Sequence, residues 1–525
     1  MKKSEIFTHI HGAVTGFFNR PVLVNMTGGS PFRLLGGFAL PVMVGNLFQL
    51  LYTVADSAVV GRLIGVTAFA AVGAAGFFSW LLLSMILGMT QGFGTVFAKR
   101  FGAGDSPGLQ RAFRTGLGLS AAMGLALSLA GALLCKGVLL LMRTPAELTA
   151  DAALYLQILL SCMWATFFYN YLASGLRALG NSRTPMFAVI ASSTVNVILD
   201  YSLVKFFGMG VAGVALATVA AQLMSCLICL NKLLRVEEFR NAWGRHAWGR
   251  RAWGRRAEGA GAAPAASIRV RGTGTVQWST PCAGDTGLTP DAPVCAGAAP
   301  GVSNRPYGAA KPALYEMLRM GGPMSLRHGL ISAGGALTQY VINGYGAAFI
   351  AGIAGAWKIY GLLEIVAAGY EGAVATFVAQ NYGAGRIDRM EAGVKTARRT
   401  MLAASCAIGF IVLLFGRQLL GLLVSGQGVG QVLDVGQAKL NYLAVTLPAL
   451  YMLLLYRAGL QGMGNAVLPM LSGFVELAAR LACVVAAPAL LGVMGVYMAE
   501  SAGWFAAALL VIFGYLAEWR KMRRA

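Results

Sequence analysis

Two carboxylates lie in apolar stretches of the sequence, where a charge is costly. Asp56 stands near the end of the apolar run 34–58, and Asp200 lies in the run 184–207. A charged carboxylate at the depth of a membrane costs about 2.5–3.5 kcal/mol on the insertion scale. Asn196 precedes Asp200 by four residues, so on a helix their side chains share one face. Because carboxylate and amide oxygens suit hard cations, and carboxylates can carry protons, the pattern predicts a site for a proton or a sodium ion.

A second pair of oxygen-bearing side chains repeats this spacing. Thr218 and Gln222 also lie four residues apart in an apolar run, so a helix would present them on one face. Another interpretation of the carboxylates stays open. Asp56 could cap a helix end, and Asp200 could accept a hydrogen bond from a neighbouring backbone group.

Charged residues are more numerous in the apolar stretches of the second half. They are Lys358, Glu364, Glu371, Arg457, Glu476, Arg480 and Glu500. Glu476 and Arg480 lie four residues apart, which predicts an ion pair within one helix. We expect some of the other charges to form structural pairs and the rest to line a cavity that attracts a cationic substrate.

Membrane-spanning helices must position these residues. Of the 525 residues, 57% are hydrophobic and 12% are charged, whereas soluble domains have about 25% charged residues. A span needs about 20 mostly apolar residues. Twelve such stretches are predicted, near 34–58, 68–97, 110–141, 150–176, 184–207, 210–234, 314–343, 348–380, 394–424, 437–462, 466–490 and 493–518. Their length favours an all-α polytopic membrane protein over a closed β-barrel of short alternating strands.

The two halves of the sequence resemble each other. The segment 174–186 matches 458–470 at about half of its positions, and 101–104 matches 382–385. Four such pairs keep their order at an offset of 281 to 284 residues. Each copy contains six spans, an even number, so both copies have the same orientation. This predicts two six-helix bundles related by a pseudo-two-fold axis along the membrane normal, with a binding site between them.

The chain is therefore predicted to have five parts. They are a cytoplasmic N-terminal segment (1–33), an N-terminal bundle (34–234), an insert (235–313), a C-terminal bundle (314–518) and a basic cytoplasmic tail (519–525). The insert carries a tandem Ala-Trp-Gly-Arg repeat and is otherwise rich in Gly, Ala, Pro, Ser and Thr. Such a composition cannot bury enough apolar surface to fold, so we expect a disordered basic cytoplasmic insert. Pro41 gives the first span a place to bend, or else a static kink.

The net charge of +22 is concentrated in segments that lie on one side of the membrane if there are twelve spans. The positive-inside bias then places both termini and the insert in the cytoplasm. Because the charge is mainly a topology signal, no nucleic-acid partner is expected. The sequence contains no Walker loop, and its four histidines form no metal-ligand cluster. We expect no enzyme activity, no cofactor, and no metal beyond a possible sodium ion.

Two segments carry a family resemblance. Residues 40–62 resemble the first helix of MATE transporters, the multidrug and toxic compound extrusion family, and residues 375–385 resemble the end of their eighth helix. The resemblance covers about 34–234 and 314–515 and is strongest for the bacterial DinF-like branch. Another branch places its cation site on helix seven, where this chain has Arg327 and His328 but no carboxylate well inside the span.

The resemblance implies a cation-coupling site in the first bundle. Asp56, Asn196, Asp200 and Thr218 correspond one by one to the residues of that site, and Pro41 corresponds to the proline at which helix one bends.

The resemblance also implies a function. It predicts a secondary active exporter that exchanges small amphipathic or cationic organic compounds for protons or sodium ions across the bacterial cytoplasmic membrane. We expect a multi-pass monomer in the lipid bilayer. Two alternatives stay open, a lipid-linked oligosaccharide flippase of the same superfamily and a non-transport membrane scaffold or enzyme. Flippases of this kind tend to have strongly cationic cavities and often fourteen spans.

The predicted topology can be tested with reporter fusions. Fusions at Arg305 and at Ala525 should both report a cytoplasmic location, because the Lys and Arg asymmetry places both sites on the same side. One cytoplasmic and one external reporter would contradict twelve spans.

Overall fold

The computed structural model describes residues 23–141, 146–243, 267–270, 276–279, 312–423, 429–486 and 492–524. Within these ranges the chain is almost entirely helical, as predicted. The long helices of the first half are α2 (Pro31–Val59), α3 (Val66–Gly102), α4 (Ser106–Leu141), α5 (Ala146–Ser161), α6 (Met163–Ala178), α7 (Arg183–Lys205) and α8 (Gly210–Leu233). Those of the second half are α10 (Ala313–Ile342), α11 (Ala347–Gly383), α12 (Ile387–Gly421), α13 (Val429–Met463), α14 (Val467–Leu481) and α16 (Met494–Arg524). Three short helical segments, η1 (Val60–Ile64), η3 (Asn343–Tyr345) and η4 (Ala482–Ala486), continue α2, α10 and α14.

These helices occupy the places of the twelve predicted spans. Ten of the described helices are long and apolar enough to cross a membrane, and α5 and α6, which meet at a bend of 46°, make an eleventh if they are counted as one span. The bend lies at Cys162, which leaves helical geometry with φ −103° and ψ 15°. Helix α10 takes the place of the seventh predicted span. It is 30 residues long and carries Arg327 and His328 in its middle, and it is not among these ten helices.

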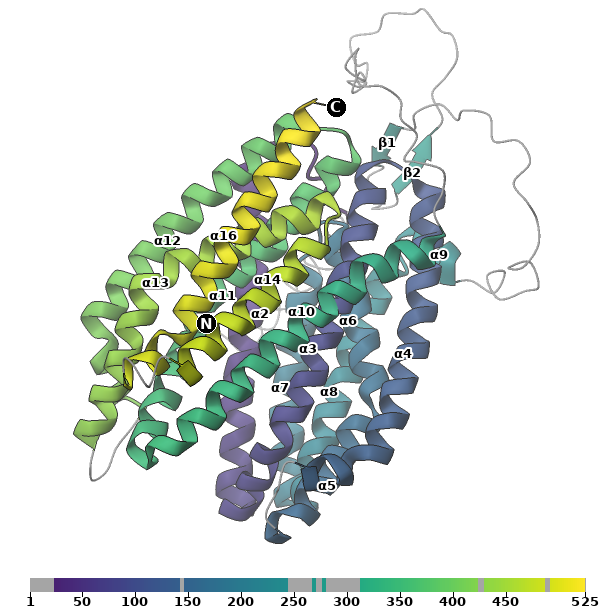
Figure 1. Cartoon of the computed structure of the whole chain (residues 1–525). Coiled ribbons are helices and arrows are strands. Elements are labelled where there is room, and N and C mark those ends of the chain that lie inside the picture. Colours follow the sequence, from purple (N-terminus) through teal and green to yellow (C-terminus); the bar gives the residue numbers. More distant parts are fainter. Residues whose placement is uncertain are drawn as a thin grey trace, which may run out of the picture.

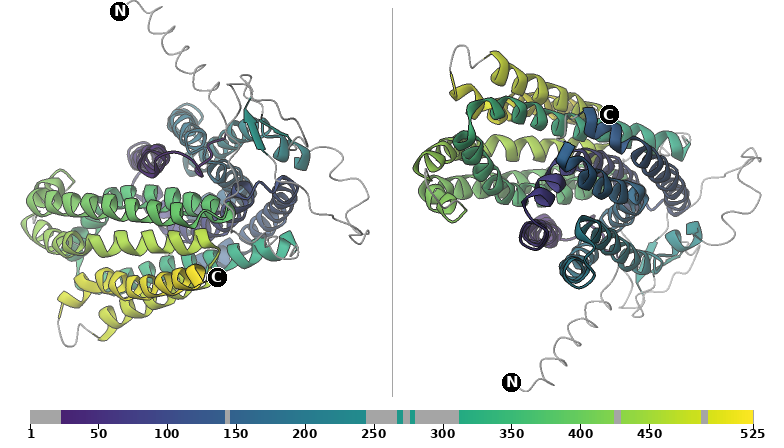
Figure 2. Two further views of the ribbon diagram at one scale, coloured as in Figure 1. Left: turned by 90° about the horizontal axis from the view of Figure 1, so that it is seen from above. Right: turned by 90° about the horizontal axis from the view of Figure 1, so that it is seen from below.

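The helices form two bundles, one from each half of the sequence. In the first, α3 packs against α5 and α6, α7 against α2 and α8, and α4 against α5 and α6. In the second, α13 packs against α11, α12 and α16, while α14 packs against α10 and α16. The bundles converge toward the end of the molecule that carries the C-terminus and diverge toward the opposite end (Figure 1). Views from above and from below show the two bundles side by side (Figure 2).

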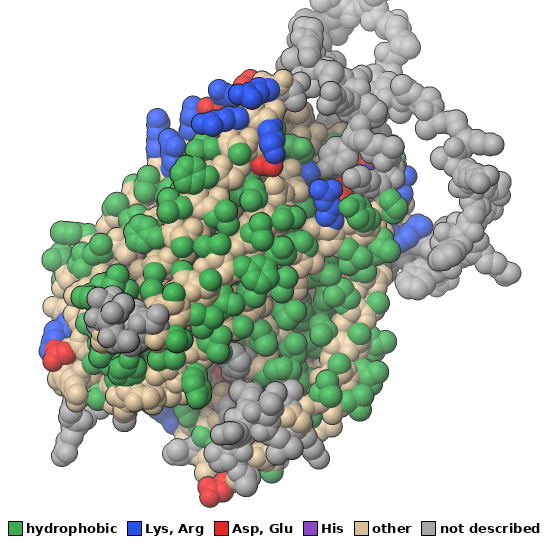
Figure 3. Space-filling model, viewed as in Figure 1, with side chains coloured by type: hydrophobic (Ala, Val, Ile, Leu, Met, Phe, Trp, Pro, Cys, Tyr) green, Lys and Arg blue, Asp and Glu red, His purple; other side chains and the backbone are tan. Residues whose placement is uncertain are grey.

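The outer surface of the molecule matches a membrane environment. Hydrophobic side chains cover a broad band of the face shown in Figure 3, and Lys and Arg side chains gather beyond it, at the end where the bundles converge. Lys395, Lys521 and Arg523 at this end have side chains that are 57%, 74% and 59% exposed. We call this the basic end.

The bundles meet through small residues. Helix α3 packs along α10 and α11, and α2 packs along α11. A Cβ added at Gly92 of α3 would lie 2.5 Å from the backbone of Gly321 in α10, and one added at Gly102 would lie 2.0 Å from the carbonyl oxygen of Gln380. Only glycine allows helices to approach this closely, which is the usual way that membrane helices gain packing energy.

A short segment before α2 joins the two bundles at the basic end. We call residues 23–29 the strap. The Val24 amide donates to the Leu179 carbonyl of the first bundle at 2.9 Å, and the Met26 amide donates to Oε1 of Gln380 on α11 at 2.8 Å. Arg389 of α12 donates to the Met26 carbonyl at 3.2 Å. Met26 is 1% exposed. The strap is therefore hydrogen-bonded to both bundles, and its Met26 is buried between them.

The structure differs from the predicted organisation in the insert, parts of which fold. Residues 237–243 of the insert fold as a helix, α9 (Glu237–Trp243), because Phe239 packs against Phe113 of α4 with ring centroids 5.3 Å apart. Two strands of the insert, β1 (Ser267–Val270) and β2 (Val276–Ser279), pair in an antiparallel ladder. The expected disorder in the rest of the insert falls on residues outside the described ranges. Helix α2 begins at Pro31, close to the predicted start of the first span at 34, and α16 runs on through residues 519–524 of the predicted tail.

The glycine contacts predict a stability difference between two variants of α3. Gly92→Ala should lower the thermal unfolding midpoint of the purified protein, since overpacking a close contact costs about 1–3 kcal/mol. Gly73→Ala on the same helix is the matched control, because an added Cβ there meets nothing within 4 Å. Equal midpoints for the two variants would contradict the close approach of α3 and α10.

Candidate functional site

Asp56, Asn196 and Asp200 come together where α2 packs against α7. The two helices lie side by side, and a Cβ added at Gly45 of α2 would be 3.6 Å from the Cα of Met186 in α7. Asn196 and Asp200 are 1% and 0% exposed. The Asp56 carboxylate lies close enough to that of Asp200 for the two groups to interact directly. We call this group of side chains the carboxylate site.

Most polar atoms of the carboxylate site have no partner within the described part of the chain. These are Oδ1 of Asp56, both carboxylate oxygens of Asp200 and both side-chain polar atoms of Asn196, all of them buried. The Oε1 atom of Gln222 on α8 is also buried without a partner there. A buried polar atom left unpaired costs about 1–3 kcal/mol. A cation or a proton bound among these oxygens would remove that cost.

The alternative roles considered for the two carboxylates do not match their surroundings. Helix α2 continues past Asp56 to Val59, and it is the backbone carbonyl of Asp56, not its side chain, that accepts the hydrogen bond from Val60. The Asp200 carboxylate accepts no hydrogen bond from a described backbone group. Neither residue acts as a helix cap or a local backbone acceptor in this structure.

Two tyrosines adjoin the carboxylate site, and the sequence analysis missed both. Tyr52 lies one turn before Asp56 on α2, and Tyr155 lies on α5 and is 7% exposed. Each is near enough to interact electrostatically with both Asp56 and Asp200. The spacing of Tyr52 from Asp56 was a usable signal. Nothing in the spacing could place Tyr155, which comes from a different helix.

Thr218 lies on α8, the neighbour of α7, and is half-buried. Its hydroxyl donates to the carbonyl oxygen of Val214 in the same helix at 3.1 Å. The oxygen keeps a lone pair that can accept a proton or bind a cation. Among the residues that the structure describes, no three His, Cys, Asp or Glu side chains form a group that could hold a metal ion. Two carboxylates with amide and hydroxyl oxygens nevertheless fit a monovalent hard cation.

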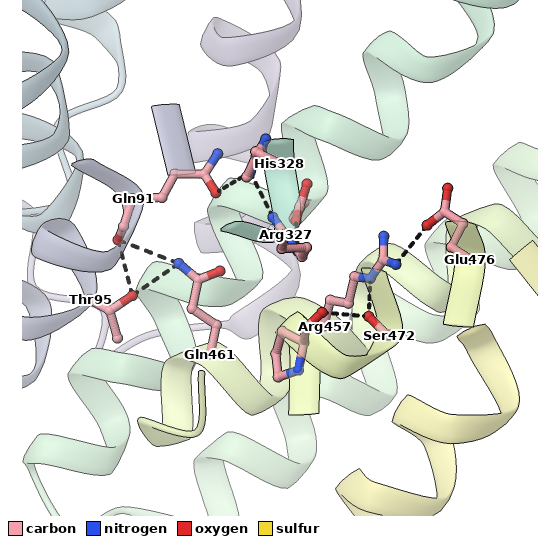
Figure 4. Close-up of polar contacts among 10 residues, drawn as sticks. Gln91, Thr95, Arg327, His328, Arg457, Gln461, Ser472 and Glu476 are labelled. Carbon is pink, nitrogen blue, oxygen red and sulfur yellow. Dashed lines mark hydrogen bonds and ion pairs between the residues drawn. The ribbon is translucent and has the colours of Figure 1, made fainter. Parts of the chain in front are cut away.

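The charges of the second bundle pair with one another. The predicted contact between Glu476 and Arg480 is present at 2.7 Å, and Arg457 of α13 approaches the other oxygen of Glu476 at 2.7 Å (Figure 4). The Nε of Arg457 also donates to the Ser472 hydroxyl at 2.8 Å. These side chains are buried, so Glu476 and the two arginines form a structural cluster.

A second group of polar side chains crosses between the bundles. Nε2 of His328 on α10 lies 2.8 Å from a guanidinium nitrogen of Arg327 and 3.4 Å from Oε1 of Gln91 on α3 (Figure 4). Gln461 of α13 donates to the Thr95 hydroxyl of α3 at 3.0 Å. Arg327 also lies 3.5 Å from Glu371 of α11.

The remaining charges of the second bundle fall into three situations. Glu500 on α16 is 2% exposed and pairs with Lys439 of α13, which is 1% exposed. Lys439 was not among the predicted residues. Glu364 is half-buried within α11, whereas Lys358 on the same helix is exposed and lines no described site. Whether Lys358 belongs to the charges that line a cavity stays a prediction.

Comparison with known proteins agrees with this architecture. The MatE family model matches residues 41–202 and again residues 323–484. The probable multidrug resistance protein YpnP of Bacillus subtilis is 30% identical over 198 residues, which are 38% of this chain and 44% of that relative. In that match the chain spans less than half of the relative's length. The probable multidrug resistance protein NorM of Thermotoga maritima is 22% identical over 491 residues, 92% of each chain.

Two solved structures share the fold. A MOP superfamily transporter from Pyrococcus furiosus has a TM-score of 0.76 at 20% identity, covering 95% of this chain and 98% of that one. The outward-facing conformation of a multidrug resistance MATE family transporter has a TM-score of 0.75 at 20% identity, covering 96% and 99%. The two segments matched by the family model make up more than half of the chain and fall one in each bundle. The chain therefore belongs to the MATE family, whose members are membrane transporters and not enzymes.

Proposed function

We propose that this chain is a secondary active exporter that exchanges small amphipathic or cationic organic compounds for protons or sodium ions. The observation that carries the proposal is the carboxylate site, where Asp56 and Asp200 hold buried oxygens without partners in the described chain. The relatives named probable multidrug resistance proteins support the substrate class. Both bundles lie in one chain, so we propose a monomer. The Lys and Arg asymmetry of the sequence supports termini in the cytoplasm.

Coupling requires that ion and substrate favour different conformations. Here the bundles touch at the basic end and diverge at the other. A proton or cation at Asp56 neutralises charge on α2, the helix that Pro41 interrupts. Proline removes one backbone hydrogen bond, so α2 can change its path at that point at lower cost than an uninterrupted helix. Repacking of α2 would alter its contact with α11 and hence the join between the bundles.

The energies involved are of matching size. Moving one elementary charge across 100 mV releases about 2.3 kcal/mol. Holding a charged carboxylate at membrane depth costs about 2.5–3.5 kcal/mol. Neutralising one carboxylate therefore changes the energy of the bundle by an amount similar to what one ion releases as it crosses the membrane.

The carboxylate site predicts which substitutions abolish coupling. Asp56→Asn and Asp200→Asn should each abolish gradient-driven efflux, because the amide has nearly the same shape but takes up no proton and has no negative charge for a cation to neutralise. Efflux is measured per molecule of inserted protein. Asp434→Asn is the matched control, since its side chain is 67% exposed and pairs only with Arg417 at the surface.

Glu476→Gln should behave differently. It leaves two buried arginines without their shared carboxylate, so it should lower stability by about 3–5 kcal/mol and reduce the amount of protein. Efflux per remaining molecule should persist. Full activity in both Asp variants, with activity per molecule lost only in the Glu variant, would move the coupling site to the second bundle.

The coupling ion can be identified in proteoliposomes. A proton gradient and a sodium gradient are imposed one at a time, and efflux of a cationic dye is followed. One of the two gradients should drive efflux, and an ionophore that collapses it should stop efflux, because the carboxylate site supplies oxygens to either ion. Dye movement that neither gradient drives would contradict antiport.

A further inference from the structure

The internal repeat relates the carboxylate site to a second place in the other bundle. The match of segment 174–186 to segment 458–470 sets an offset of 284 residues for the fourth and fifth spans. The glycines of the sixth and twelfth spans, 210 and 213 against 492 and 495, set an offset of 282 residues. With these offsets, Tyr155 corresponds to Lys439, and Thr218 corresponds to Glu500.

The burial of the helices supports this alignment. Tyr155 and Leu156 of α5 are both buried, as are Lys439 and Leu440 of α13. Tyr155 adjoins Asp56 and Asp200 in the first bundle. Its counterpart Lys439 therefore lies where the second bundle would hold its own copy of the site.

The ammonium group of Lys439 is surrounded by oxygen atoms. Its Nζ donates to the carbonyl oxygens of Val496 at 3.3 Å and Tyr497 at 3.0 Å, and to Oε2 of Glu500. An ammonium has three donors, and here each has an acceptor. The hydroxyls of Thr446 and Ser501, which lie 2.7 Å apart, follow Lys439 and Glu500 along the same two helices.

We propose that Lys439 is a tethered cation that fills a latent monovalent-cation site in the second bundle. The site consists of the Glu500 carboxylate and the Val496 and Tyr497 carbonyls. Carboxylate and carbonyl oxygens are the ligands that hard cations such as sodium and potassium prefer. The Oε1 atom of Glu500 is buried without a described partner, so the carboxylate has a further oxygen to offer. With its own amine in place, the second bundle takes up no ion, and any exchange of cations is confined to the first.

The inference concerns binding, so it does not rest on the proposed antiport. It is tested on the purified full-length chain by thermal unfolding, with sodium or potassium chloride replacing choline chloride at constant ionic strength. Lys439→Met removes the charge and keeps the length of the side chain. Without sodium or potassium, the unfolding midpoint of the variant should lie below that of the parent. As sodium or potassium is added, the midpoint of the variant should rise more steeply than that of the parent with one of these ions, because binding to the folded state stabilises it by mass action. Comparison with the parent cancels any contribution from Asp56 and Asp200.

Two variants separate cation binding from a purely structural ion pair. Glu500→Gln should lower the unfolding midpoint, since the lysine remains and the carboxylate is gone. Its midpoint should respond to sodium and potassium no more than that of the parent. The double variant Lys439→Met/Glu500→Gln should unfold above either single variant and show no added response. A Lys439→Met protein that responds to sodium and potassium no more than the parent does overturns the proposal. So does an equal response in the double variant, or a Lys439→Met protein that cannot be purified in either salt while the double variant is stable.

Discussion

A charge inside a membrane must have a partner, and the two bundles meet this constraint in different ways. The second bundle pairs its buried charges with one another, as Glu476 does with Arg457 and Arg480. The first bundle leaves Asp56 and Asp200 without an opposite charge on a described side chain. Among the described residues, the second bundle thus places opposite charges beside Glu476, whereas the first places none beside Asp56 and Asp200.

The way the bundles pack follows from the same environment. Between two membrane helices, lipid competes for every apolar contact, so association depends on close fit and on hydrogen bonds rather than on the exclusion of water. Gly92 and Gly321 provide the close fit between α3 and α10. His328 and Gln461 provide polar contacts to α3 nearby. Small and polar residues therefore contribute to the join between the bundles, and large apolar side chains, such as Met320 of α10 and Phe93 of α3, pack there as well.

Much of this arrangement could be predicted from the sequence, because spacing along one helix is a one-dimensional property. The Asn196–Asp200 and Glu476–Arg480 pairs were identified by their separation of four residues. Contacts between different helices could not be predicted from spacing along the sequence. In a membrane helix the lipid-facing and core-facing sides are both apolar, so periodicity does not reveal which way a helix turns. Tyr155 was missed for that reason.

Lys439 and α9 were missed for other reasons. Lys439 lies near the predicted start of its span, where a lysine is expected to reach toward water, yet it turns inward to Glu500. The helix α9 was assigned to a disordered insert on average composition. Its seven residues pack through Phe239, which contacts Phe113 and Tyr171, and through Glu238, which accepts a hydrogen bond from the Ser106 hydroxyl. An average over the whole insert conceals these contacts.

The strap also has a consequence for how the chain is made. Met26 leaves the ribosome early, but its partner Gln380 follows 354 residues later. At about 5–20 residues per second, this separation corresponds to about 20–70 s of synthesis. During that time the buried amide of Met26 has no native acceptor, and the first bundle is inserted with its N-terminal edge unsealed. Closure of the strap onto Gln380 therefore follows the synthesis of α11, so the strap joins the bundles only after part of the second bundle has been made.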